Sequence, residues 1–380
     1  MKVTGDWIDT PATQAVCRAM EAAGHQALFV GGCVRNALLD RPVSDIDIAT
    51  DADPHTVSDI AESAGFKVVP TGIDHGTVTV ISHGIPHEVT TFRQDIETDG
   101  RRAVVAYSPH IEDDAARRDF TMNALYARRD GTVIDPLGGL PDLLARRLRF
   151  VGDADARIRE DYLRILRFFR FHAIYGDPDG GIDAEGLAAC ARHASAISGL
   201  SAERIGAEMR KLLAADDPAP SVAAMERAGV LAQVLPGGDA RFLAVLVHLE
   251  DGLPPRWLRR LAVLGGEDVT HRWRLSRAES RDLGHIRDAL GAMSTPAVLG
   301  YRLGAMLAAD TVLARAALFG TAPPDNWMTE IGRGASTAFP VKPADLMPAL
   351  QGAALGARLK ELEAEWLQSD LRLPRETLLG

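Results

Sequence analysis

The chain has 380 residues, a length that suggests two or three domains at roughly 150 residues each. Hydrophobic residues make up 46% of the chain and charged residues 25%, a globular balance that excludes an intrinsically disordered chain. The formal net charge of −10 excludes a uniformly basic nucleic-acid coat, although a local basic groove needs only a few well-placed cations.

Cysteine usage and hydropathy indicate the compartment. Cys17, Cys33 and Cys190 have no paired spacing, so we expect neither a disulfide framework nor a cysteine zinc site, and a reducing cytoplasm fits them. Residues 1–14 lack the apolar core of a signal peptide. The longest strongly apolar stretch that we identify, 242–249, is too short to span a membrane. We therefore expect a soluble cytoplasmic protein without a membrane partner.

Residues 27–150 combine short β-rich runs with turns of Gly, Pro and Asp. A short helix is predicted over 34–39, and 83–86 joins two strands as a hairpin. The segment 93–102 is poor in apolar residues, which predicts a mobile surface loop. The pattern indicates an α/β or α+β unit with a small mixed or antiparallel sheet. Strands are predicted over 27–30, 45–49, 77–82 and 87–92.

From about residue 152 the apolar residues recur at helical spacing, and the last part of the chain shows no internal repeat. We expect an α+β head at 1–150, a helical neck at 151–215 and a helical body and tail at 216–380. Helices are predicted over 156–174, 184–197, 201–214 and 220–228.

A pair of aspartates carries the strongest chemical signal. On a strand, Asp45 and Asp47 share one face, and two carboxylates so close repel each other unless a cation such as Mg²⁺ lies between them. Upstream, Gly31 and Gly32 let backbone N–H groups approach a triphosphate, and Arg35 adds donors. Alone, Asp-x-Asp is more often a solvated turn or helix cap, and Gly-Gly only a turn. The order strand, Gly-Gly, helix and Asp-x-Asp is rarer, and a nucleotidyltransferase palm requires it.

Two further groups are candidates for the same site. Glu88 follows on the second hairpin strand, where it can reach the metals or deprotonate an attacking hydroxyl if that strand neighbours Asp45 and Asp47; the alternative is a solvent-exposed glutamate. The next motif covers residues 117–124, and taken alone it is best explained as the capped start of an amphipathic helix. Beside a triphosphate, however, Arg118 becomes a phosphate or sugar contact that Asp119 orients, and Asn123 can bond a ribose hydroxyl.

The third motif lies on the predicted helix that starts near residue 156. Tyr162, Ile165, Leu166 and Phe169 form an apolar stripe that fixes the helix to the body. The polar side carries Asp161, Arg164 and Arg167, with Arg170 at its margin. Residues 146–172 hold eight Arg against four Asp or Glu, which favours an anionic partner. The simpler alternative is an ion pair between Asp161 and Arg164 on the helix surface.

Asp161 and Arg164 together can distinguish nucleobases. Cytosine and adenine present an amine donor beside a ring-nitrogen acceptor, whereas uracil and guanine present a carbonyl beside an N–H donor. A carboxylate only accepts hydrogen bonds and a guanidinium only donates them, so the pair matches C and A. A mismatched buried edge costs about 1–3 kcal/mol per unsatisfied group. Such a helix selects bases without a template.

Six segments in one order closely resemble the class II tRNA nucleotidyltransferases, the CCA-adding enzymes that share an origin with bacterial poly(A) polymerases. The resemblance covers about residues 25–213. The segments are VGGCVRNALLDRPVSDIDIAT, EVTTFRQD, RRDFTMNALYA, DPLGG, EDYLRILRFFRF and SAERIGAEMRKLL.

The resemblance implies a polymerase-β-like head, a helical neck, and a body and tail that hold the tRNA acceptor arm and 3′ end. It implies two Mg²⁺ ions on Asp45 and Asp47, and CTP or ATP contacts from Gly32, Arg35 and Arg118. Asp161 and Arg164 become the base-reading pair, with Arg167 and Arg170 beside them on the nucleotide-binding helix. The family's flexible loop, which takes part in the switch from C to A addition, corresponds to 93–102. No obligate protein partner is evident.

Some features depart from the family or leave alternatives open. Asn36 stands where the family more often has aspartate, and Asp40 where it usually has glycine. A poly(A) polymerase, a partial enzyme that adds only A or only CC, and a catalytically silent RNA-binding protein are the rival functions. An additional phosphohydrolase activity is not predicted. In the C-terminal part, Arg256, Arg259 and Arg260 form either a phosphate-tracking surface or a solvated helical face, and Arg272, Arg274, Arg277 and Arg281 form a second such group.

Overall fold

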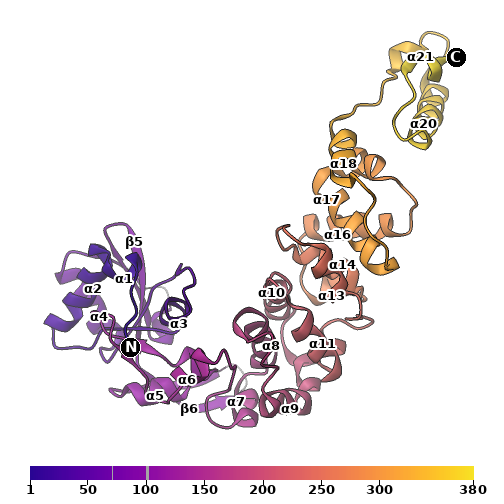
Figure 1. Ribbon diagram of the computed structural model, residues 1–380. Coiled ribbons are helices and arrows are strands. Elements are labelled where there is room, and N and C mark those ends of the chain that lie inside the picture. Colours follow the sequence, from indigo (N-terminus) through magenta and orange to yellow (C-terminus); the bar gives the residue numbers. More distant parts are fainter. Residues whose placement is uncertain (71, 100–101) are drawn as a thin grey trace. The chain divides into compact units, whose positions relative to one another are not determined.

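The computed structural model describes residues 1–70, 72–99 and 102–380, and the chain divides into two compact units (Figure 1). The first unit comprises 1–200 and 227–233, and the second comprises 201–226 and 234–380. The first contains a mixed sheet followed by helices and the second is helical, so the predicted α+β class is confirmed. The three-domain division at 150 and 215 stays a prediction.

A seven-stranded sheet forms the centre of the N-terminal region, with strand order β3-β4-β5-β2-β1-β8-β9. Only β2 and β5 pair in parallel, so the sheet is mixed, as one of our two alternatives predicts. The hairpin turn is shorter than predicted, because only His83 and Gly84 join the strands, both with positive φ as a two-residue turn requires. The strands are β1 (Leu28–Val30), β2 (Asp47–Thr50), β3 (Lys67–Val69), β4 (Thr77–Ser82), β5 (Ile85–Thr91), β8 (Tyr126–Ala127) and β9 (Val133–Ile134).

One face of this sheet is buried under helices. Along β4, Val78 and Val80 are fully buried, whereas Thr77 and Thr79 alternate with them on the other, more exposed face. Helices α2 and α4 pack on β4, so the opposite face is left for polar side chains. The helical elements of this part are α1 (Asp6–Asp9), α2 (Pro11–Ala22), α3 (Gly32–Leu38), α4 (Pro54–Ser63), η1 (Ile73–His75), α5 (Ile111–Ala116), η2 (Thr121–Asn123) and α6 (Leu140–Leu144).

The loop predicted over 93–102 is wrong as secondary structure. β6 (Arg93–Asp99) and β7 (Arg102–Tyr107) form a two-stranded antiparallel hairpin with an irregularity between Asp95 and Glu97. The composition of 93–102 misled the prediction because the sequence that follows, rich in β-branched valine, supplies a partner strand. Positions 100 and 101 of the predicted loop lie outside the described residues.

The predicted helix over 156–174 is two helices, α7 (Ala154–Glu160) and α8 (Leu163–Tyr175). At the break Asp161 is extended, and its side chain accepts a hydrogen bond from the backbone N–H of Leu163 at 3.1 Å. Asp161 therefore caps the start of α8, as a short acceptor side chain does at a helix N-terminus. α9 (Ala184–Arg192) and η3 (Ala194–Gly199) follow in the first unit.

α8 is fixed to the sheet region by aromatic packing. Ile165, Leu166 and Phe169 are buried, which confirms most of the predicted stripe, while Tyr162 is half-buried. Phe168 is also fully buried and stacks on Phe150 with ring centroids 5.3 Å apart. This contact places the polar side of α8 at a fixed position relative to the sheet.

The second unit is built from short helices around α17, which consists of two helical segments separated by a kink at Gly304 (φ 76°, ψ 167°). By length and composition, α17 is also the one helix in the described part of the chain that is long and apolar enough to cross a membrane, although Arg302, Asp310 and Arg315 interrupt its apolar residues. Most of this helix is buried against its neighbours, α18 above all, as in the core of a folded protein. From residue 201 onward the helices are α10 (Ala202–Leu213), α11 (Ala219–Arg227), α12 (Val230–Val234), α13 (Leu243–Leu249), α14 (Trp257–Leu264), α15 (Val269–Arg272), α16 (Arg277–Leu290), α17 (Pro296–Phe319), α18 (Trp327–Ser336), α19 (Pro343–Leu346), α20 (Gly352–Gln368) and α21 (Arg375–Leu379).

Two arginines of the expected phosphate-tracking surface are not on the surface. Arg259 and Arg260 are 2% and 1% exposed, and both donate to the buried carboxylate of Glu250. The sequence prediction failed here because an arginine-rich helix start does not show which side of the helix faces the core. The second group, 272–281, keeps its arginines exposed.

Candidate active site

Three carboxylates meet on the polar face of the sheet. Because β2 and β5 pair in parallel with Asp47 opposite Glu88, these two side chains lie on the same face. Asp45 lies just before β2, and Thr79 is opposite Glu88 on β4. All four residues line one pocket of about 520 Å³. Glu88 does neighbour Asp47, which was the condition for a role at this site, but its side chain is exposed, as the alternative also expects. The strand starts at Asp47, two residues later than predicted.

The charges in this pocket interact. Burial raises the pKa of Asp47, Glu88 and Asp45 raise it further through their negative charge, and only Arg118 opposes the shift. Burial and the neighbouring carboxylates both disfavour the charged form of Asp47, and a divalent cation between the carboxylates would relieve the repulsion.

The donor set fits a magnesium site of a particular kind. Among the described residues, no group of three or more His, Cys, Asp and Glu side chains is arranged to hold a metal ion. Glu88 therefore does not complete a three-carboxylate cage. Asp45 and Asp47 are then the two carboxylates that could hold the metal. Mg²⁺ is usually held by one or two carboxylates together with substrate phosphates.

The paired glycines allow a close approach of Arg118. Gly31 has φ 70°, and a Cβ atom there would lie 3.2 Å from Nη1 of Arg118. Gly31 directly precedes α3, which begins at Gly32. The backbone at this turn is thus left open beside a guanidinium group, the arrangement that a phosphate-binding turn needs.

Arg35 is a buried bridge. Its side chain donates to Oδ1 of Asn123 at 2.5 Å, to the hydroxyl of Tyr175 at 2.7 Å and to Oδ1 of Asn36 at 2.9 Å. The guanidinium also lies 4.0 Å from the centre of the Tyr175 ring. Asn36 in turn donates to the carbonyl of Pro42, which the aspartate more usual in the family does not do. Arg35 therefore joins the sheet region to α8, and its predicted contact to the nucleotide stays a prediction.

Asp114, which the sequence analysis missed, holds Arg118 in position. It is 1% exposed, and it accepts hydrogen bonds from Arg118 Nη2 at 2.9 Å, from Arg117 and from the hydroxyl of Tyr126. Burial disfavours its charge, but the two arginines and the tyrosine outweigh burial and lower the pKa of Asp114 to about 2. The four-residue spacing of Asp114 and Arg118 was the available signal.

The role expected for Asp119 is wrong, because Asp114 and not Asp119 orients Arg118. Asp119 accepts from Nδ2 of Asn123 at 2.9 Å and from Nε of Arg167 at 2.7 Å. Burial opposes its ionisation, but Arg167 and Asn123 together lower the pKa of Asp119. Both ends of the Asn123 amide are bound within the protein, and its ribose contact stays a prediction.

α8 carries a group of cations as predicted, but with different partners. On α8, Arg167 and Arg170 lie 5.1 and 4.4 Å from the centre of the Phe171 ring, and Arg35 of α3 lies 5.2 Å from the same ring. The partners found for Arg164 differ from the Asp161 of the alternative ion pair. Arg164 pairs with Glu160 and donates to the carbonyl of Arg157 at 2.9 Å, because the break at Asp161 turns that residue into a cap.

Comparison with known proteins agrees with this geometry. Residues 27–149 match the family model described as "Poly A polymerase head domain", and residues 181–242 match "Probable RNA and SrmB- binding site of polymerase A". The fold and the acidic pocket thus define a nucleotidyltransferase with a head of the poly(A) polymerase type, and enzymes of this polymerase-β-like class generally use divalent metal ions.

Individual relatives identify the family within this class. The mitochondrial CCA tRNA nucleotidyltransferase 1 of Mus musculus is 32% identical over 98% of this chain and 89% of its own length. The CCA-adding enzyme of Geobacillus thermodenitrificans is 36% identical over 83% of this chain and 72% of its own. The Bacillus stearothermophilus CCA-adding enzyme in complex with CTP superposes with a TM-score of 0.74 at 29% identity, covering 94% of this chain and 93% of that one. The chain belongs to the family of CCA-adding tRNA nucleotidyltransferases, within the wider poly(A) polymerase group. Its relatives are bacterial or mitochondrial, and the cytoplasmic location stays a prediction.

Proposed function

We propose that this protein adds C, C and A to the 3′ end of tRNA from CTP and ATP without a nucleic-acid template. One observation carries the proposal. The carboxylate pocket and the arginines of α8 belong to the same compact unit, and Arg118 links them. Arg118 lies close enough to Asp47 to lower its pKa, and it donates to the carbonyl of Asn123, whose side chain is bonded to Asp119, the partner of Arg167 on α8. Relatedness to CCA-adding enzymes over nearly the whole chain supports the same activity.

The reaction is an in-line nucleotidyl transfer. The tRNA 3′-oxygen forms a bond to the α-phosphorus of the nucleotide, the bond from that phosphorus to the α,β-bridging oxygen breaks, and pyrophosphate leaves. We assign the role of proton acceptor for the 3′-hydroxyl to Glu88, because it lies beside Asp47 in the pocket. Asp45 and Asp47 would hold two Mg²⁺ ions, which supply charge neutralisation at the attacking and leaving oxygens.

Arg118 is the group best placed to bind the triphosphate. It lies close enough to lower the pKa of Asp47, and Asp114 and Tyr126 fix its orientation. The backbone of Gly31 and Gly32 beside it leaves room for phosphate oxygens.

Selection of the base is assigned to α8. Asp161 and Arg164 stand at its N-terminal end, where the backbone N–H of Arg164 donates to the carbonyl of Asp161 at 2.9 Å. Their acceptor and donor groups match the edges of C and A, and Arg167 and Arg170 supply positive charge beside them. The β6–β7 hairpin contains the segment assigned to the switch from C to A addition.

Solved relatives support the partners. Structures of other CCA-adding enzymes are described as complexes with tRNA, with CTP and with ATP, at 19–20% identity to this chain. At that identity they share the fold with this protein. We assign the acceptor arm of tRNA to the helical body and tail on this basis.

The decisive experiment is an incorporation assay with tRNA transcripts that end before the CCA sequence. We expect CMP addition with CTP alone, and one complete CCA with CTP and ATP together, after which addition stops. Long tails from ATP alone on arbitrary RNA would identify a poly(A) polymerase, addition of CC only or A only would identify a partial enzyme, and no incorporation at all would refute the proposal.

A further inference from the structure

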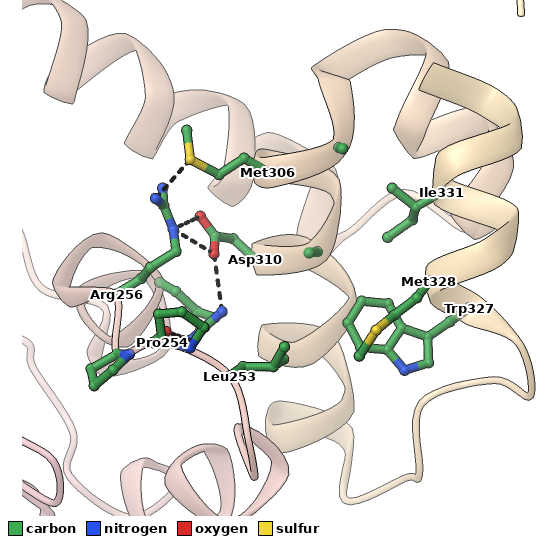
Figure 2. A pocket seen from close by; sticks show the side chains of 12 residues that line it. Leu253, Pro254, Arg256, Met306, Asp310, Trp327, Met328 and Ile331 are labelled. Atoms are coloured by element: carbon green, nitrogen blue, oxygen red, sulfur yellow. Dashed lines mark hydrogen bonds and ion pairs between the residues drawn. The ribbon is translucent and has the colours of Figure 1, made fainter. Parts of the chain in front are cut away.

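A second pocket lies in the second unit and shares no lining residue with the carboxylate pocket. It has a volume of about 580 Å³ and runs between residues 253–256, α17 and α18 (Figure 2). Figure 2 shows Arg256 and Asp310 at one end and Trp327 with Met328 at the other. Ala305 and Ala309, one turn apart on α17, line the part between, and their small side chains leave the space open. The volume is that of a small-molecule site.

The charged end of this pocket belongs to a buried ion network. Asp310 is fully buried and accepts from Nε of Arg256 at 2.9 Å and from Arg259 at 3.3 Å. Glu250 accepts from Arg259 at 2.6 Å and from Arg260 at 2.7 Å. Three guanidinium groups thus face two carboxylates, which leaves an excess of one positive charge.

Of the three arginines, only Arg256 can offer this excess positive charge to a ligand. The remaining donors of Arg260 are taken by the carbonyls of Leu213, Ala215 and Asp216, and Nη2 of Arg259 by that of Pro254. Arg256 has 30% of its side chain exposed, and its Nη1 contacts only the sulfur of Met306, a weak acceptor. Among the described residues, no partner contacts its Nη2.

The rest of the pocket is apolar. Leu253, Met306, Met328 and Ile331 line it, and Met306 and Met328 are 54% and 53% exposed. Beyond the charged end, the indole N–H of Trp327 is the one polar side-chain group of the lining. A nucleobase would leave several ring and exocyclic groups without partners on such walls, at a cost that disfavours RNA here. A ligand with one anionic group and an apolar body has no such cost.

We propose that this pocket binds a medium-chain alkyl carboxylate. The carboxylate accepts hydrogen bonds from the Nη groups of Arg256, in the forked geometry that guanidinium groups offer to carboxylates. The alkyl chain lies over Ala305 and Ala309 toward Met328 and Trp327. Flexible methionine side chains adapt to such a chain, as they do at other apolar binding surfaces.

The test is isothermal titration calorimetry of the full chain with octanoate, and with 1-octanol as the uncharged probe of equal length. Arg256→Gln removes the charge. Ala305→Leu fills the pocket from an exposed position and leaves the ion network intact. Arg241→Gln is the matched control, because Arg241 is an exposed arginine that pairs with Asp239 outside the pocket.

We expect one saturable octanoate site in the wild type and in Arg241→Gln. Binding should weaken about tenfold or more in Arg256→Gln and disappear in Ala305→Leu, and 1-octanol should bind much more weakly than octanoate. Circular dichroism of each variant establishes whether it is folded. If Arg256→Gln does not fold, the binding result for Ala305→Leu decides whether the proposal holds. Absence of saturable binding, binding unchanged in Ala305→Leu, or equal binding of 1-octanol would overturn the proposal. If AMP binds more strongly than octanoate and Ala305→Leu abolishes the binding of AMP, the pocket is assigned to RNA instead.

Discussion

Individual carboxylates have different tasks in the first unit according to their surroundings. Asp45 and Asp47 are partly open to the pocket and crowded by Glu88, so they are suited to a cation that arrives with the substrate. Asp114 and Asp119 are enclosed and bonded to arginines, so they hold those arginines in position. The carboxylate group therefore binds the cation in the pocket, and in the enclosed positions it orients arginine side chains.

The metal assignment predicts the effect of removing the aspartate pair. Changing both Asp45 and Asp47 to Ala should lower incorporation of CMP and AMP by at least about 10³-fold, because the metal would lose its protein ligands. tRNA binding, measured by filter retention, should persist. Asp59→Ala is the control, since Asp59 is an exposed aspartate on α4 outside the pocket. Wild-type incorporation in the double variant would contradict the assignment.

The position of Arg118 predicts a second effect. Asp114→Asn keeps the shape of the side chain but removes the charge that orients Arg118, so the KM for CTP should rise about tenfold. Arg117→Gln removes the other ion pair of the same carboxylate and should leave KM within about twofold. Steady-state kinetics on both variants provide the comparison. Equal KM changes in the two variants would show that Asp114 is merely structural.

The low pKa of Asp114 predicts a pH dependence of stability. Because the pKa is about 2 in the folded state and near 3.8 when unfolded, ionised Asp114 stabilises the fold above pH 3.8 and loses this effect as the pH falls toward 2. The full effect is about 2 kcal/mol, of which roughly half is lost by pH 3. Urea titrations at pH 5 and pH 3 should show that Asp114→Asn depends less on pH than the wild type. An identical pH dependence would disprove the contribution.

At the scale of elements, α17 and α18 show how backbone contact shapes the second unit. A Cβ atom on Gly334 would lie 1.8 Å from the carbonyl oxygen of Ala297, and one on Gly300 would lie 2.3 Å from that of Ile331. The two helices therefore touch through their backbones at these glycines. The close contact fixes their spacing beside the octanoate pocket proposed above.

This contact predicts that Gly334→Ala destabilises the second unit by about 1–3 kcal/mol, because the helices must move apart. Gly332→Ala on the same helix is the control, since a Cβ there would meet nothing within 4 Å, and it should be neutral or slightly stabilising. Chemical denaturation followed by circular dichroism measures both. Equal stabilities of the two variants would contradict the close packing.

At the scale of the whole molecule, the division into two compact units separates the tasks. The acidic pocket, Arg118 and α8 all belong to the first unit. The second unit contributes no residue to that pocket and holds its own buried ion network. Nucleotide binding is thus expected to depend on the first unit.

Hydrogen exchange can test this separation. Saturation with CTP and Mg²⁺ should slow the exchange of amides in β2, β5 and α3 by about tenfold or more, because the ligand orders the pocket. Amides of α16 to α21 should exchange at unchanged rates. Protection confined to the second unit would refute the placement of the nucleotide site.

The sequence by itself predicted β1, β2, β4 and β5, four of the nine strands in the described part of the chain, because alternation along strands and turn residues are local signals. It placed Asp45 and Asp47 together, but the pairing that brings Glu88 beside them was decided by the tertiary structure. The sequence also predicted the buried stripe of α8 from helical periodicity. Only the tertiary structure decided that Asp114 rather than Asp119 holds Arg118, that Asp161 ends one helix and caps the next, and that Arg259 and Arg260 are buried. These outcomes depend on which charged partners the packing brings together, and the chemistry of a charged side chain does not reveal its partner until the chain is folded.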